Sequence, residues 1–197
     1  MGNDFSSSLR PALVMTGLFA LLLGILYPLA ITGVAQVIFP HQANGSLVTD
    51  KAGKSIGSEL IGQNFASDRY FHPRPSAAGK GYDGMASSGS NFGPTSQPLA
   101  DRVKGDVAKL SAETPGRAIP ADLVTTSGSG LDPDISPEAA FFQAGRVAKA
   151  RGLGVDVVRQ LIQRSIDTPM ISFLGDPRVN VLAINRELDA LAATSGR

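Results

Sequence analysis

The 197-residue sequence contains no cysteine, which excludes disulfides, thiolate metal sites and cysteine nucleophiles. It has only two histidines, His41 and His72, too few for a histidine-rich metal site. The formal net charge is +1, and lysine and arginine form no run along the chain. Binding of nucleic acid through a basic patch is therefore disfavoured, because such binding depends on clustered positive charge.

A long stretch near the N-terminus also lacks charge, since no Asp, Glu, Lys or Arg occurs between Pro11 and Pro40. As a helix, this stretch spans roughly 40 Å, more than the ~30 Å hydrocarbon core of a bilayer. Residues 12–39 are therefore predicted to form a single transmembrane helix. The alternative is a cleaved signal peptide ending near Gly33-Val34-Ala35, but the apolar run is about twice the length of a normal signal-peptide core.

The anchor divides the chain into three parts. Residues 1–11 form a short tail whose only basic residue is Arg10, and residues 40–197 form the main domain. Because basic residues near a span favour the cytoplasmic side, Arg10 slightly favours a cytoplasmic N-terminus and an extracytoplasmic domain.

Small residues recur within the predicted span at Gly17, Ala20, Gly24 and Pro28, at steps of three, four and four. In lipid, small residues allow helices to approach closely, so this stripe predicts packing against the helices of another protein. The alternative is that glycine is simply common in membrane spans.

Residues 71–98 form a long segment with no helical or strand period, half of it Gly, Pro or Ser. A flexible linker has no need of large apolar side chains, yet this segment and its border carry several: Tyr70, Phe71, Tyr82, Met85 and Phe92. Aromatic side chains are normally buried, and burial fixes the backbone that carries them. We therefore expect an ordered, functional loop and not a linker.

The rest of the chain predicts one α+β domain that is richer in helix than in strand. Ser136 before Pro137 and Gly152 after a basic turn mark the two ends of one helix. The predicted elements are a hairpin near Ala52-Gly53, helices at 95–116, 137–151, 156–165 and 181–193, and short strands at 121–126 and 170–174.

No catalytic or metal-binding motif is visible. Gly53-Lys54-Ser55 lacks the first glycine of a phosphate-binding loop, and Asp132, Asp134 and Glu138 do not have calcium-loop spacing. His72 lies between Arg69 and Arg74 in the sequence, a setting that lowers its basicity and favours a hydrogen-bonding role. We expect no active site, no metal site and no bound cofactor.

Five segments together resemble the KdpC family, which supplies one component of the Kdp potassium-transporting P-type ATPase complex. They are YFHPRPSA (70–77), GSNFGPTSQPL (89–99), SGSGLDPDISPEAA (127–140), RVAKARGL (146–153) and FLGDPRVNVLAINRELD (173–189). They occur in the same order, and the resemblance runs from the membrane helix nearly to the end of the chain.

This resemblance implies a non-catalytic accessory subunit of an ATP-driven potassium uptake pump in the bacterial inner membrane. The implied partners are a channel-like potassium-binding subunit, an ATP-hydrolysing P-type subunit and a small membrane peptide. The implied role is to assemble the complex and, as a catalytic chaperone, to raise its affinity for ATP. The docking surface implied by the loop contains Tyr70, Phe71, Pro73, Arg74, Pro75, Tyr82, Asn91, Phe92, Gly93 and Pro94.

The family carries ATP-binding and nucleotide-binding labels, but an extracytoplasmic domain cannot reach cytosolic ATP. Residues 153–157, Leu-Gly-Val-Asp-Val, also lack the Ser and Gln of the signature-like stretch carried by relatives. We therefore expect ATP to act through the partner subunit. The other functions considered are a membrane-anchored hydrolase and an independent membrane-anchored solute-binding module.

Overall fold

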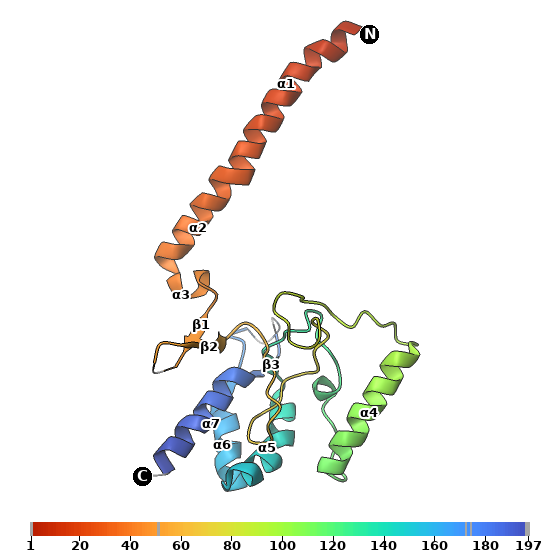
Figure 1. The fold of residues 1–197 in the computed structure, drawn as a ribbon, viewed down its shortest axis with the longest axis vertical. Helices are drawn as coiled ribbons and strands as arrows, with labels where there is room; N and C mark the ends of the chain where they lie inside the picture. The colour runs from red at the N-terminus through yellow and green to blue at the C-terminus, as the bar shows by residue number, and fades with distance from the viewer. Residues whose placement is uncertain (1, 51, 172, 174, 196–197) are drawn as a thin grey trace. The chain divides into compact units, whose positions relative to one another are not determined.

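The computed structural model describes residues 2–50, 52–171, 173 and 175–195. It divides the chain into two compact units, residues 1–47 and 48–197 (Figure 1). Each unit is described separately below.

The first unit is a long helix with a π-helical turn in its middle. It consists of α1 (Gly2–Leu21), the π turn η1 (Leu22–Leu26), α2 (Tyr27–Ile38) and the short α3 (Pro40–Ala43). Ser7–Ile38 is long and apolar enough to cross a membrane, and none of its 18-residue apolar window is buried. The structure thus contains the long apolar helix that the sequence predicts.

The π turn has a local cause. Pro28 has no N–H group, so the carbonyl of Gly24 loses its usual partner four residues ahead. The helix widens here, and the N–H of Tyr27 bonds to the carbonyl of Leu22. A π turn changes the rotation per residue, so whether the small residues before and after it face the same partner stays a prediction.

A hairpin of β1 (Leu47–Thr49), which begins at the boundary between the units, and β2 (Ser55–Ser58) confirms the hairpin predicted near Ala52-Gly53. In its turn, the Asp50 carboxylate accepts hydrogen bonds from the backbone N–H groups of Ala52 and Lys54, both at 2.9 Å. Gly53 has φ +80°, which glycine adopts without strain.

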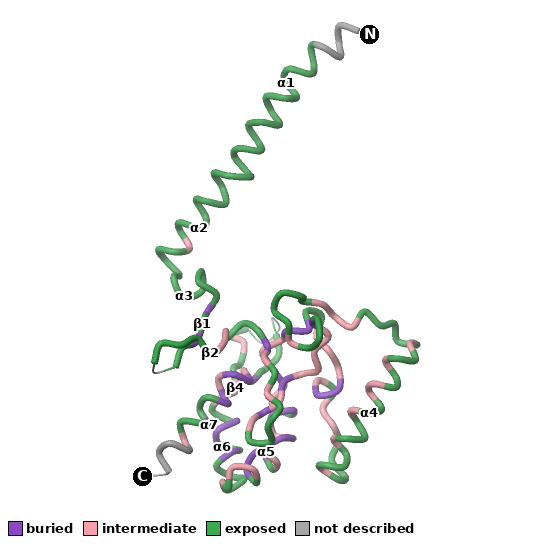
Figure 2. Tube along the Cα trace, viewed as in Figure 1, coloured by how far each residue is buried: buried purple, intermediate pink, exposed green. Residues whose placement is uncertain are grey.

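The core of the second unit lies between a layer of helices and a small antiparallel sheet. The sheet order is β3 (Asp134–Ile135), β5 (Arg178–Asn180), β4 (Ile166–Asp167), with Val179 opposite both Ile135 and Ile166. Three helices contact β5: α5 (Pro137–Arg151), α6 (Val155–Ser165) and α7 (Val181–Ser195). Figure 2 shows that the buried residues concentrate in these elements.

Local signals set the ends of α5 as predicted. The Ser136 hydroxyl accepts a hydrogen bond from the Ala139 N–H at 3.0 Å, and Gly152 takes the left-handed conformation that ends the helix. Helix α4 (Gln97–Glu113) also forms as predicted, but the Ser96 side chain makes no capping bond.

Both predicted single strands are wrong where the structure describes them. Residues 121–126 contain the 3₁₀ turn η2 (Ala121–Leu123), because Pro120 and the backbone bonds that follow it close a tight turn. Met170, Ile171 and Phe173 lie in the connection between β4 and β5 and belong to no strand, while residues 172 and 174 lie outside the described residues. The strands at 166–167 and 178–180 are too short to show a sequence period.

Candidate functional site: the 68–94 loop and its anchors

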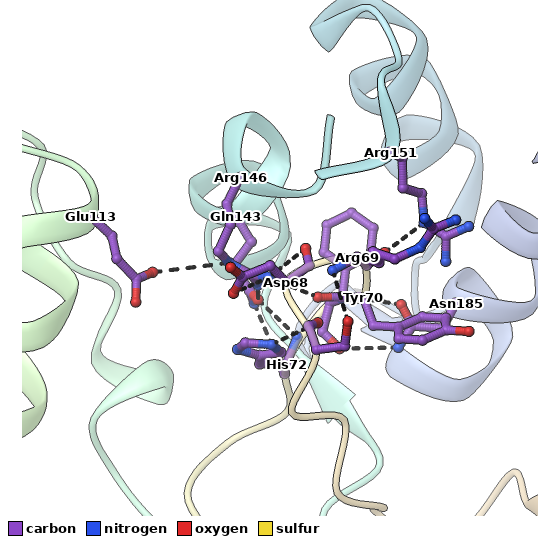
Figure 3. A network of polar contacts seen from close by, with 11 residues as sticks. Asp68, Arg69, Tyr70, His72, Glu113, Gln143, Arg146, Arg151 and Asn185 are labelled. Atoms are coloured by element: carbon purple, nitrogen blue, oxygen red, sulfur yellow. Dashed lines mark hydrogen bonds and ion pairs between the residues drawn. The ribbon is translucent and has the colours of Figure 1, made fainter. Parts of the chain in front are cut away.

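Two amide side chains hold the backbone at the start of the loop. The Phe71 N–H donates to Asn185 Oδ1 at 2.8 Å, and Asn185 Nδ2 donates to the Phe71 carbonyl at 3.0 Å. The next residue repeats the arrangement: the His72 N–H donates to Gln143 Oε1 at 2.8 Å, and Gln143 Nε2 donates to the His72 carbonyl at 3.0 Å. Both amides are buried, on α7 and α5 respectively (Figure 3). They supply the hydrogen bonds that a neighbouring strand would supply in a sheet.

Two arginines at the C-terminal half of α5 hold the three preceding carbonyl groups. Arg146 Nη1 donates to the carbonyls of Asp68 at 2.8 Å and Tyr70 at 3.1 Å. Arg151 Nε donates to the carbonyl of Arg69 at 2.6 Å. Five consecutive carbonyl groups, from residue 68 to residue 72, therefore accept hydrogen bonds from side chains of α5 and α7 (Figure 3).

Tyr70 and Arg151 form a second set of contacts above this segment. The guanidinium of Arg151 lies 4.8 Å from the centre of the Tyr70 ring, a cation–π distance. Both side chains also bond to Asp189 on α7, Arg151 Nη2 to Oδ1 at 2.8 Å and the Tyr70 hydroxyl to Oδ2 at 3.1 Å. Tyr70 thus contacts both α5, through Arg151, and α7, through Asp189.

Burial sets the electrostatics of His72. Desolvation is the main factor that lowers the pKa of His72, and the nearby charge of Arg146 lowers it further. The lowered basicity expected from the sequence is confirmed, but the responsible cation is Arg146 and not Arg69 or Arg74. His72 Nε2 lies 3.1 Å from the carbonyl of Ser67, so it also fills the predicted hydrogen-bonding role.

The middle of the loop is held by polar contacts to residues 125–132. Arg74 Nη1 forms an ion pair with Asp132 Oδ2 at 2.9 Å. The Ser76 hydroxyl donates to the carbonyl of Gly130 at 2.6 Å and accepts from the Tyr82 N–H at 2.8 Å. A side chain at Gly130 would meet the carbonyl of Ser88 and the backbone nitrogen of Ala78, so glycine is required for this close approach.

Tyr82 belongs to this anchored half of the loop. Its hydroxyl donates to the carbonyl of Arg74 at 2.6 Å, and burial raises its pKa to about 12. Tyr82 therefore links two parts of the same loop, and its hydroxyl proton is used in the bond to Arg74.

The second half of the loop is exposed. Met85 is 96% exposed and Phe92 is 45% exposed, so the expectation that every large apolar side chain of the loop is buried is wrong for these two. Asn91, Gly93 and Pro94 are also exposed, and Asn91 has φ +53°. The structure therefore separates the predicted docking residues into an anchored group near Phe71 and Tyr82 and an exposed tip around Phe92.

Sequence reasoning missed the anchors. Asn185, Gln143, Arg146 and Arg151 lie between 71 and 114 positions from the residues that they bind, so no local spacing joins them. The one available signal was a polar amide on an apolar helix face: Asn185 lies beside Ile184 on a buried stripe. Among the described residues, no group of three or more His, Asp or Glu is placed to hold a metal ion.

The family model described as KdpC, K+-transporting ATPase c chain, matches residues 9–190. The chain belongs to this family. A curated relative from Caulobacter vibrioides (strain NA1000 / CB15N) is 64% identical over 184 residues, covering 93% of each chain. A relative from Caulobacter sp. (strain K31) is 60% identical and covers 97% of each chain. One from Rhodopseudomonas palustris (strain ATCC BAA-98 / CGA009) is 55% identical and covers 93% of this chain and 96% of its own. All three are named potassium-transporting ATPase KdpC subunit.

Proposed function

We propose that this chain is the accessory subunit, without an active site of its own, of an ATP-driven potassium uptake pump in the bacterial inner membrane. The observation that carries the proposal is the family match over residues 9–190, together with relatives up to 64% identical that are named as subunits of a potassium-transporting ATPase. The long apolar helix Ser7–Ile38 supports a membrane anchor.

The proposed topology is a cytoplasmic N-terminus, a single span and an extracytoplasmic domain. Arg10 near the start of the span supports this orientation, since basic residues favour the cytoplasmic end. With this topology the domain has no access to cytosolic ATP. Its effect on ATP affinity is then a coupling free energy transmitted through the ATP-hydrolysing partner.

The proposed partners are the channel-like subunit, the ATP-hydrolysing subunit and the small membrane peptide. The loop supports an assembly role because side chains of α5 and α7 fix the backbone of residues 68–72, while Phe92 remains exposed. A loop that is ordered at its base and apolar at its tip binds a partner with little further loss of conformational entropy.

Co-purification tests this function directly. The chain carries a C-terminal tag after Arg197, and native membranes are extracted in mild detergent. We expect the channel-like and ATP-hydrolysing subunits at fixed stoichiometry, and an increased apparent KM for ATP in complexes made without this chain. Recovery of the chain alone from cells that express the pump overturns the proposal. An unchanged KM overturns only the effect on ATP affinity.

A further inference from the structure

Helix α4 is packed differently from the other long helices of the second unit. None of its 17 residues is buried, and Figure 2 shows it in the colours of intermediate and exposed residues. Its apolar side chains Leu99, Val103 and Leu110 are only partly covered. Figure 1 shows α4 standing apart from the α5–α7 layer.

Two hollows lie beneath α4. One, of about 140 Å³, is lined by Leu110 and other residues of α4 on one side and by Pro73, Phe142 and Arg146 on the other. The second, of about 350 Å³, includes Phe92 at the loop tip. Pro75 and Asp106 line both, so the two hollows adjoin and form one crevice, here called the α4 crevice.

Arg102 lines the crevice with incomplete hydrogen bonding. Its Nε and Nη1 atoms are enclosed and have no hydrogen-bond acceptor among the described residues. Nη1 forms an ion pair with Asp106 Oδ2 one turn along the helix, at the long distance of 3.5 Å. Buried N–H groups are almost always paired in native proteins, so an acceptor from an occupant of the crevice satisfies these two groups.

The charges of the α4 wall indicate what kind of acceptor fits. Arg102, Asp106, Lys109 and Glu113 alternate in sign along the crevice. This wall has no net charge, and Arg146 on the facing wall adds one positive charge, so the crevice suits a dipolar occupant that offers hydrogen-bond acceptors. An extended peptide has this character, because it offers a carbonyl acceptor at each residue and carries no charge on its backbone. The proline and phenylalanine side chains of the facing wall suit its apolar side chains.

We propose that the α4 crevice receives one extended segment of a partner subunit, with backbone carbonyl groups that accept hydrogen bonds from Arg102. The segment lies along the crevice between Phe92 and Arg146. This inference rests on the proposed function, because the segment belongs to another subunit of the pump.

The absence of cysteine permits a direct test by thiol modification. Single-cysteine variants Ser90→Cys and Lys109→Cys place a thiol in each hollow. Ala108→Cys is the matched control, because Ala108 is exposed on the same helix and lines neither hollow. Maleimide modification is measured on the full chain alone in detergent and on the assembled complex. We expect assembly to slow modification at positions 90 and 109 by about tenfold or more and to leave position 108 within about twofold, since an occluded thiol reacts only during local opening.

Other outcomes overturn the inference. If assembly leaves the modification rate unchanged at all three positions, the crevice is empty in the complex. If assembly slows modification at position 108 as well, the partner covers the outside of α4. If no complex is recovered, the proposed function fails before labelling begins and this inference fails with it. A benzophenone maleimide on Ser90→Cys adds an independent readout: we expect cross-links to one contiguous peptide of a partner. Cross-links scattered over several subunits contradict a single bound segment.

Arg102→Gln provides the energetic test. We expect it to lower recovery of the partner subunits at least about tenfold in a stringent wash, since one charge-assisted hydrogen-bonding group is lost. Arg159→Gln is the control, because the Arg159 side chain is 59% exposed and its ion pair is with Asp156 in the same helix. Equal recovery for the two variants contradicts a role of Arg102 in binding.

Discussion

Asn185 pairs with both backbone groups of Phe71, a residue 114 positions away, and takes the place of a neighbouring strand. Both bonds, at 2.8 and 3.0 Å, lie in the core, where the exposed fraction of Asn185 is 2% and that of Phe71 is 0%. A buried amide with both ends satisfied at one residue fixes position and direction together. The loop that follows therefore begins from a defined point on α7.

Replacing Asn185 tests this anchor. Asn185→Ala leaves a buried N–H and a buried carbonyl without partners, and each costs about 1–3 kcal/mol. We expect the free energy of unfolding to fall by about 2–4 kcal/mol. The measurement is urea unfolding of the full chain in detergent, with circular dichroism as the signal. Gln160→Ala, at an exposed position of α6, serves as the control and is expected to change stability by less than about 0.5 kcal/mol. A similar loss for both variants would show that the two hydrogen bonds between Asn185 and Phe71 make no particular contribution to stability.

The parts of the fold that the sequence predicts are those with local causes. Ser136, Pro137 and Gly152 are adjacent to the helix that they delimit, and the apolar period of α7 lies within one segment. The apolar length of Ser7–Ile38 is likewise a local property. Such signals need no knowledge of the rest of the chain.

The anchoring of the loop depends on pairs that are far apart in sequence. Nothing near Phe71 indicates that an asparagine of α7 binds it, and nothing near Arg69 indicates Arg151. Strands of two or three residues, such as β4 and β5, are also too short for a period and form only because their partners are present. Aromatic content predicted burial correctly for Phe71 but not for Phe92, because composition does not show which side of a loop faces the core.

Stability should depend on pH through His72. Its pKa is lowered in the folded state, mainly by burial, so the unfolded chain binds more protons below about pH 6.5. The free energy of unfolding therefore falls as pH decreases below this value and levels off once the folded-state pKa is passed. Thermal unfolding between about pH 7.5 and 5.5 measures the slope.

The two histidines allow a matched comparison for this pH effect. We expect His72→Asn to flatten the slope and His41→Asn, which retains His72, to keep it. His72 is packed near Arg146, Asp68 and Glu113, but only histidine side chains have ordinary pKa values inside this interval. A slope unchanged by His72→Asn would assign the effect elsewhere.

Phe92, and not Tyr82, is the residue with which to test docking of the loop. Phe92 is 45% exposed, whereas the Tyr82 hydroxyl is bonded to the Arg74 carbonyl. We expect Phe92→Ala to leave the unfolding temperature within about 2 °C and to lower recovery of the partner subunits several-fold, since buried aromatic anchors dominate interfaces. Tyr82→Ala is expected to lower the unfolding temperature itself. Met85→Ala, which removes an almost fully exposed side chain from the same loop, is the control. Full recovery of the partner subunits with Phe92→Ala would show that the loop tip is not part of the interface.

The small residues of the membrane helix give a separate prediction. A Cβ atom built at Gly17, Gly24 or Gly33 meets no heavy atom within 4 Å apart from its chain neighbours and the backbone of its own helix, so nothing else in the chain crowds a side chain that begins there. If Gly17 and Gly24 contact partner helices, leucine there separates the backbones and removes close packing. We expect Gly24→Leu to reduce co-purification of the partner subunits several-fold and Gly33→Leu, outside the predicted stripe, to preserve it.

Because Gly24 lies in the π turn, Gly17→Leu is needed to separate loss of packing from a change in helix shape. If both Gly17→Leu and Gly24→Leu reduce co-purification of the partner subunits, the result supports a packing stripe. If only Gly24→Leu reduces it, the effect belongs to the π turn. If neither variant reduces it, these glycines face lipid.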